Sequence, residues 1–116
     1  KLYLLPQNQQ DLIKEALDLY KKASLLHKDS LPYFPIGLAQ YNDNYLAFGY
    51  KNNKKGYICV YNMHDNKEIT FTLNNIKTLK LVYPTTLKTD FKFINNNFTW
   101  TVDSSLQARI FYFEEE

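Results

Sequence analysis

The amino-acid sequence predicts a mainly β protein, an antiparallel β-sandwich of about seven to eight strands preceded by one N-terminal α-helix. Apolar residues recur with helical spacing near the N-terminus and with alternating spacing from residue 45 onward. Short polar segments rich in asparagine interrupt the alternating stretches at close intervals. No helical pattern lies between the strands, and this disfavours a parallel α/β sheet.

The composition is that of one ordinary globular domain. The chain has 116 residues, of which 45% are hydrophobic and 16% aromatic, and a domain of this length holds a core without disulfides or metal ions. The net charge is only +2, and all basic residues except Arg109 are lysines scattered along the chain. We therefore expect no nucleic-acid partner, and no membrane partner because no apolar run is long enough to span a bilayer.

The helix is expected over residues 9–27. Its apolar face contains Leu12, Ile13, Ala16, Leu17 and Tyr20, which recur at three- and four-residue steps. Asn8 suits the N-cap position, and Pro32 cannot continue a helix. The sequence thus divides into a helical segment, residues 1–30, and a β domain, residues 31–116.

Seven strands are expected within the β domain. They span 45–51, 57–62, 68–74, 77–83, 91–94, 98–103 and 106–113. A longer hairpin loop containing Gly56 is expected at 52–56. The asparagines at 95–97 suit a tight turn, because asparagine tolerates positive φ.

Two of the segments alternate cleanly between apolar and polar residues. In EITFTLN the apolar positions are separated by Thr70 and Thr72, and in FTWTVD they are separated by Thr99 and Thr101. Such strands have one face in the core and one in water. The dry faces are expected to hold Ile69, Phe71 and Leu73 in the first segment, and Phe98, Trp100 and Val102 in the second.

The strands at 45–51 and 57–62 are different, because both of their faces contain apolar or aromatic residues. Strands that are apolar on both faces need cover on both faces, either from the N-terminal helix or from protein outside this chain. Tyr45, Tyr57 and Tyr61 are the candidate docking or sugar-stacking residues, since a tyrosine ring packs on apolar surface and also on sugar rings. The alternative is that they are half-buried packing residues.

The sequence offers few groups that could carry a reaction. The carboxylates fall on the helix, in turns, at strand ends and in the acidic tail, so no catalytic pair is expected. His27 and His64 lack the spacing of a metal site, and the glycines form no phosphate loop, so we expect neither metal nor cofactor. Cys59 is expected to be a buried free thiol in a cytoplasmic protein.

Arg109 is the other residue of interest. It lies in the strand segment LQARIFYF, on the same face as Phe111 and Phe113. A lone arginine in such a strand is expected to be a structural clamp, whose planar guanidinium pairs with a carboxylate or with backbone oxygens. A contact with an anion or a sugar is the alternative.

The order of several segments resembles the C-terminal end of family 36 glycoside hydrolases, the melibiase or α-galactosidase group. These segments are EALDLYKKASLL, PYFPIGL, YLAFGYKNNKKGYICVYN, LVYP and LQARIFYF, and they extend from about Leu12 to Phe113. The sequence departs from the family at Tyr33-Phe34, where a tryptophan is expected before Pro35-Ile36-Gly37-Leu38.

The resemblance implies an antiparallel sandwich that follows a (β/α)8 catalytic barrel. Residues 1–30 are then the end of that barrel or a connector, and the catalytic carboxylates lie upstream, so no residue of this chain is assigned a catalytic role. The expected function is that of a non-catalytic accessory domain, which packs against the barrel of a retaining α-galactosidase and stabilises it. The resemblance leaves open whether the parent protein is a homo-oligomer.

The sequence is also compatible with one alternative function. The domain would be a carbohydrate-binding module that binds sugars weakly, with Tyr45, Tyr57 and Tyr61 as a stacking platform. A free-standing enzyme is disfavoured, because no two carboxylates are expected to converge in a cleft.

Overall fold

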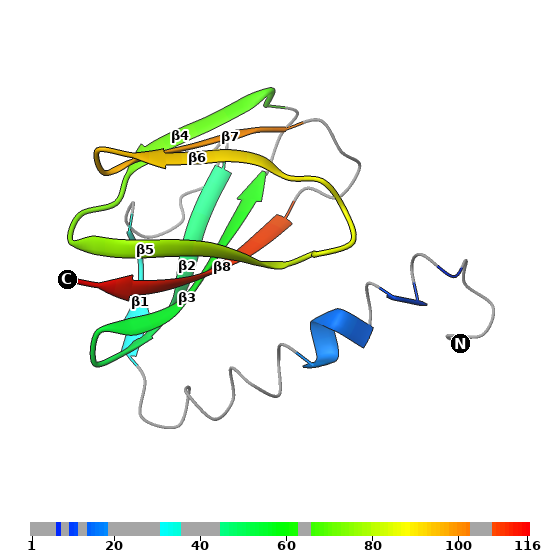
Figure 1. The fold of residues 1–116 in the computed structure, drawn as a ribbon, viewed down its shortest axis with the longest axis horizontal. Helices are drawn as coiled ribbons and strands as arrows, with labels where there is room; N and C mark the ends of the chain where they lie inside the picture. The colour runs from blue at the N-terminus through cyan, green and yellow to red at the C-terminus, as the bar shows by residue number, and fades with distance from the viewer. Residues whose placement is uncertain are drawn as a thin grey trace.

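The structure, a computed structural model, describes residues 7, 10–11, 14–18, 31–35, 45–62, 66–102 and 108–116. Two antiparallel sheets face each other, which confirms the predicted sandwich (Figure 1). The five-stranded sheet has the order β1-β2-β3-β8-β5, and the three-stranded sheet has the order β4-β7-β6. The strands are β1 (Leu31–Tyr33), β2 (Tyr45–Asn52), β3 (Lys55–Asn62), β4 (Glu68–Thr72), β5 (Ile76–Tyr83), β6 (Asp90–Ile94), β7 (Asn97–Thr101) and β8 (Ala108–Glu115).

Helical structure precedes the strands, as expected. Residues 14–18 are helical, as are residues 7, 10 and 11, and the other positions of the expected helix at 9–27 lie outside the described residues. Residues 14–18 lie on the side of the five-stranded sheet that faces away from the three-stranded sheet (Figure 1). Among the described residues, no helix is long and apolar enough to cross a bilayer.

The core lies between the two sheets. Trp100 and Phe98 on β7 are fully buried and face Phe111 and Phe113 on β8. The rings of Phe98 and Phe111 meet edge to face, with 5.2 Å between their centroids, an arrangement that aromatic pairs favour. The buried positions in β4 and β7 are those that the alternation predicted, and the intervening threonines face outward.

Asparagines occupy the tight turns. Asn95 and Asn96 form the two-residue connection between β6 and β7, with φ values of 52° and 69°, as the sequence predicted. Asn53 has a φ of 62° in the connection between β2 and β3. That connection is shorter than the expected loop at 52–56, because Asn52 pairs with Lys55 across the hairpin.

Strand β1 was not predicted. It contains only three residues, includes Pro32, and pairs with β2 at the edge of the sheet. Proline is tolerated there because an edge strand need not donate every backbone N–H group.

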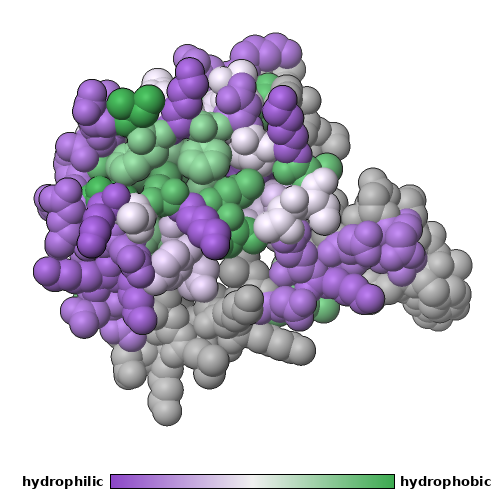
Figure 2. Space-filling model, in the orientation of Figure 1, coloured by the Kyte–Doolittle hydropathy of each residue, from purple (hydrophilic) through white to green (hydrophobic). Residues whose placement is uncertain are grey.

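The sandwich is open along one side. Figure 2 shows apolar side chains gathered between β5 and β6, the edge strands of the two sheets. Leu79 and Leu81 on β5 and Phe91 and Phe93 on β6 pack against the core but are only partly buried. The core therefore reaches the molecular surface along this side.

Candidate functional site

The outer surface of the five-stranded sheet is unusually apolar. The side chains that alternate with the buried residues of β2, β3 and β8 point away from the core. We call this surface the outer aromatic face; it contains Leu46, Phe48, Tyr50, Tyr57, Cys59, Tyr61, Ile110 and Tyr112. A sheet whose second face meets only water normally carries polar residues there.

Three tyrosines form one row across this face. Tyr50 on β2 is directly opposite Tyr57 on β3, which is opposite Tyr112 on β8. The rings of Tyr57 and Tyr112 lie edge to face, with 5.5 Å between their centroids. Phe48 and Tyr61 belong to the neighbouring rows. The face is therefore a continuous aromatic surface rather than a set of isolated side chains.

The centre and the border of the face differ in polarity. Phe48, Tyr50 and Tyr61 keep 41%, 42% and 43% of their surface exposed. Charged residues occur at the border, where Lys55 and Glu114 lie at strand ends and Lys80 lies on the edge strand β5. An apolar centre with a polar border is typical of protein–protein interfaces.

The structure separates Tyr45 from the other two candidate tyrosines. Tyr57 and Tyr61 lie on the outer aromatic face, whereas Tyr45 points between the two sheets. Its ring stacks on Phe71 of β4 at 6.1 Å between centroids, and its hydroxyl donates a hydrogen bond to the backbone oxygen of Thr70. The expected platform of three tyrosines is therefore not assembled, because β2 places Tyr45 in the same layer as buried Ala47.

Arg109 lies in the core with no exposed surface. Its Nε donates a hydrogen bond to Thr89 Oγ1 at 2.7 Å, and Nη1 donates to the backbone oxygen of Ala108 at 2.9 Å. The guanidinium carbon lies 4.9 Å from the ring centroid of Trp100, within the range of a cation–π contact. This residue joins β8, β7 and the segment before β6, and it does not line the outer aromatic face.

Cys59 lies at the middle of the outer aromatic face as a free thiol. Burial raises the pKa of this thiol to about 11, which disfavours the nucleophilic thiolate. His27 and His64, the other residues considered for chemistry, lie outside the described residues. Within the described ranges, no three histidine, cysteine, aspartate or glutamate side chains are placed to hold a metal ion.

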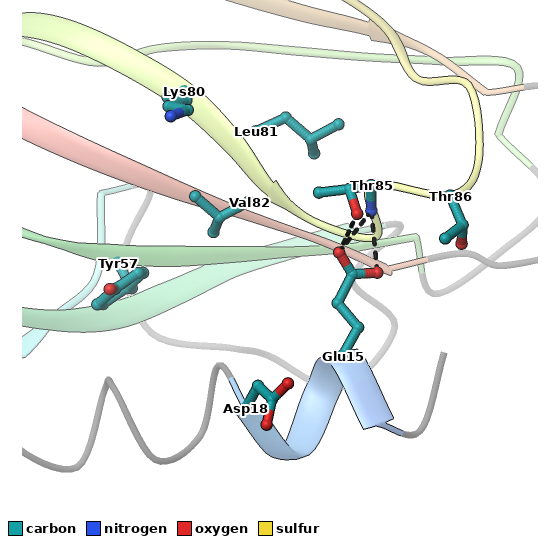
Figure 3. Close-up of a pocket in the computed structure, with 8 residues that line it drawn as sticks. All are labelled: Glu15, Asp18, Tyr57, Lys80, Leu81, Val82, Thr85 and Thr86. Atoms are coloured by element: carbon teal, nitrogen blue, oxygen red, sulfur yellow. Dashed lines mark hydrogen bonds between the residues drawn. The ribbon is translucent and has the colours of Figure 1, made fainter. Parts of the chain in front are cut away.

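A groove of about 500 Å³ lies between the helical residues 14–18 and β5 (Figure 3). Glu15 and Asp18 come from the helix, and Tyr57 reaches the groove from β3. The remaining lining residues are Lys80, Leu81 and Val82 on β5 and Thr85 and Thr86 in the segment that follows it. We call this site the helix–sheet groove.

Glu15 holds the two walls of the groove together. Its carboxylate oxygens accept hydrogen bonds from the backbone N–H of Thr85 at 2.9 Å and 3.0 Å, and the Thr85 hydroxyl donates a further bond to the same carboxylate (Figure 3). Burial, together with the nearby Glu15 carboxylate, raises the pKa of Tyr83. Glu15 is therefore engaged in positioning the segment after β5.

The sequence did not point to this groove. Glu15 and Asp18 are three residues apart and so lie on one side of a helix, which sequence reasoning can recognise. The partner of Glu15, Thr85, is 70 positions away in the sequence, and nothing in the local pattern pairs these two segments. Phe48, Tyr50 and Tyr112 were missed for a related reason, because alternation gives two faces of a strand without showing which one is outside.

No protein-family model, curated protein or solved structure matches this chain. The resemblance to family 36 glycoside hydrolases therefore stays a prediction from the sequence.

Proposed function

We propose that this chain is a non-catalytic accessory domain of a glycoside hydrolase of the α-galactosidase type, and that its outer aromatic face packs against a (β/α)8 catalytic barrel. The observation that carries the docking part is the continuous aromatic surface with its charged border. The glycosidase part rests on the sequence resemblance alone.

Burial of the outer aromatic face gives a physical reason for docking. Phe48, Tyr50 and Tyr61 each leave about two fifths of their surface in water. Covering apolar surface is favourable by roughly 25 cal/mol per Å², and aromatic residues are enriched at the centres of interfaces. A large partner with a complementary apolar surface would stabilise this domain and be stabilised by it.

The arrangement of the carboxylates supports a non-catalytic role. Glu15 and Asp18 are the acidic residues that line the helix–sheet groove, and both come from the same helix. A glycosidase needs its two carboxyl groups on opposite sides of the scissile bond, whereas side chains three residues apart on a helix share one side. Both oxygens of Glu15 are also occupied by Thr85.

The carbohydrate-binding alternative loses its original basis. It required Tyr45, Tyr57 and Tyr61 on one platform, and Tyr45 faces the core. A sugar site in this chain has to be sought elsewhere on its surface.

Two measurements test the proposal. The isolated chain should not hydrolyse p-nitrophenyl α-galactoside, and measurable turnover that survives purification would contradict a non-catalytic role. For docking, the product of the reading frame upstream of the Lys1 codon is co-expressed with the chain, and complex formation is measured by size-exclusion chromatography.

A matched pair of variants makes the docking test specific. Replacing Phe48, Tyr50 and Tyr61 together by serine should abolish the complex, because it removes the exposed aromatic surface. Replacing Thr70 and Thr101 by serine, on the outer side of the three-stranded sheet, should leave it intact. A complex that tolerates the first set of changes would contradict docking through the outer aromatic face.

A further inference from the structure

We propose that the helix–sheet groove binds a small neutral saccharide, with Tyr57 and Val82 against an apolar face of the sugar and with Asp18 and Lys80 bonded to its hydroxyl groups. Tyr57 also belongs to the outer aromatic face, and Lys80 lies at its border. The inference goes beyond the proposed accessory role and applies to the chain with this face uncovered.

The size and construction of the groove suit a small ligand. Its volume of about 500 Å³ lies within the roughly 300–1,000 Å³ of small-molecule sites. Its walls come from two segments far apart in the sequence, and Glu15 ties them together through Thr85. A site whose walls are already held in place loses less free energy on ordering when a ligand binds.

The charges in the groove indicate what kind of ligand fits. Asp18 on the helix and Lys80 on β5 both line it (Figure 3). Within the described part of the chain, neither side chain is engaged in a hydrogen bond or an ion pair, and they do not pair with each other. One wall thus offers a free acceptor and the other a free donor.

A neutral ligand with hydroxyl groups satisfies both walls. An anion would bind Lys80 but would be repelled by the carboxylates of Glu15 and Asp18. A cation would be attracted by Asp18 but repelled by Lys80, and the oxygens of Glu15 are already engaged by Thr85. A sugar carries several hydroxyl groups, each of which both donates and accepts, so it can offer a donor to Asp18 and an acceptor to Lys80. The hydroxyls of Thr85 and Thr86 add further groups of the same kind at one end.

The apolar part of the groove fits the C–H face of a sugar ring. Tyr57 is held in place by its edge-to-face contact with Tyr112, and Val82 lines the groove from β5 (Figure 3). Aromatic side chains such as tyrosine present an apolar ring face and a polar hydroxyl in the same residue. This pairing matches a saccharide, which has C–H groups on one face and hydroxyls around its edge.

The test is a titration of the chain with galactose, glucose, mannose and lactose, followed by two-dimensional amide NMR. At least one sugar should cause saturable shifts at millimolar concentration, confined to residues 15–18, 57 and 80–86. Acetate and methylamine serve as charged probes. Absence of shifts with all four sugars, or equal shifts with the charged probes, would overturn the proposal.

Substitutions of residues that line the helix–sheet groove test whether the sugar binds there. Asp18 and Lys80 are exposed side chains, so Asp18→Asn and Lys80→Met should leave the fold unchanged. Each substitution should weaken sugar binding about tenfold or more, because it removes a charged hydrogen-bonding group. Lys77→Met, on the same strand but outside the groove, is the matched control and should bind normally. Unchanged binding by the Asp18 and Lys80 variants would contradict the site. A variant with Phe48 and Tyr61 replaced by serine leaves the row of Tyr50, Tyr57 and Tyr112 intact. Loss of sugar binding in this variant would contradict the site as well, because the sugar would then lie on the docking face.

Discussion

The burial and the contacts of Arg109 indicate a structural role. It is a charged side chain with no exposed surface, and its planar group bonds in several directions while stacking on Trp100. Burying an ionised group is costly unless hydrogen bonds satisfy it. The geometry is therefore that of a clamp that orders the end of the sandwich.

The clamp predicts that lysine cannot replace Arg109. A lysine has no planar fork, so Arg109→Lys should leave Thr89 Oγ1 or the Ala108 carbonyl without its donor and lower the free energy of unfolding by about 1–3 kcal/mol. Urea unfolding followed by circular dichroism measures this. Thr89→Val should cost less because it removes one bond only, and a wild-type midpoint for the lysine variant would contradict the clamp.

The raised pKa of the Cys59 thiol predicts how the stability of the protein depends on pH. Burial raises the pKa of its thiol from 9.0 to about 11, so the folded protein holds this proton more tightly than the unfolded chain. The group therefore contributes stability below pH 9 that is lost as the pH rises to about 11. Burial also raises the pKa values of Tyr33, Tyr83 and Tyr112, and their contribution acts in the same direction.

Urea midpoints on both sides of this pH range check the prediction. The wild type should lose stability between about pH 8 and about pH 10.5, and Cys59→Ala should lose less over the same interval. The difference between the two proteins isolates the thiol from the tyrosines. Parallel pH profiles would contradict the raised pKa of Cys59.

Among the elements, strand β2 depends on a glycine. A Cβ atom at Gly49 would lie 1.8 Å from the backbone oxygen of Tyr57 on the neighbouring strand. No side-chain rearrangement relieves a clash with backbone, so the two strands would have to move apart.

Gly49→Ala should therefore destabilise the protein by about 1–3 kcal/mol or more. Thermal unfolding measures the loss. Lys92→Ala, at an exposed position of β6, should stay within about 0.5 kcal/mol of the wild type. A Gly49→Ala variant as stable as the Lys92→Ala control would show that β2 and β3 do not approach as closely as described.

The strands differ in how far their sequence determines them. In β4 and β7, apolar residues alternate with threonines, so both the strand and its buried face were predicted. In β2, small residues such as Ala47 face the core while Phe48 faces outward, and an apolar pattern on both sides does not distinguish these faces. Strand β1 was missed because three residues with a proline have no visible period.

Strand order was not predictable either. Strand β8 lies between β3 and β5, and this pairing joins segments separated by long stretches of sequence. The helix–sheet groove depends on a contact of the same kind, between Glu15 and Thr85. Such contacts are set by packing of the whole domain rather than by local periodicity.

At the scale of the whole molecule, one core is shared by both sheets. Phe98 and Trp100 from the three-stranded sheet meet Phe111 from the five-stranded sheet and Arg109 beside it. Neither sheet can bury its apolar face without the other.

The shared core predicts a single cooperative unfolding transition. Trp100 fluorescence, which reports on the three-stranded sheet, should change together with the circular dichroism of all strands. Phe98→Ala should lower the free energy of unfolding by about 3–5 kcal/mol and leave the two signals coincident. Two separated transitions would indicate that the sheets unfold independently.

The two outer surfaces of the sandwich have opposite character. The three-stranded sheet presents threonines to solvent, and two of them, Thr70 and Thr99, lie within hydrogen-bond distance of each other. The five-stranded sheet presents tyrosines and phenylalanine. The molecule consequently has a built-in polarity: at an oil–water boundary or an apolar chromatography resin it would settle in one orientation, threonine side toward the water.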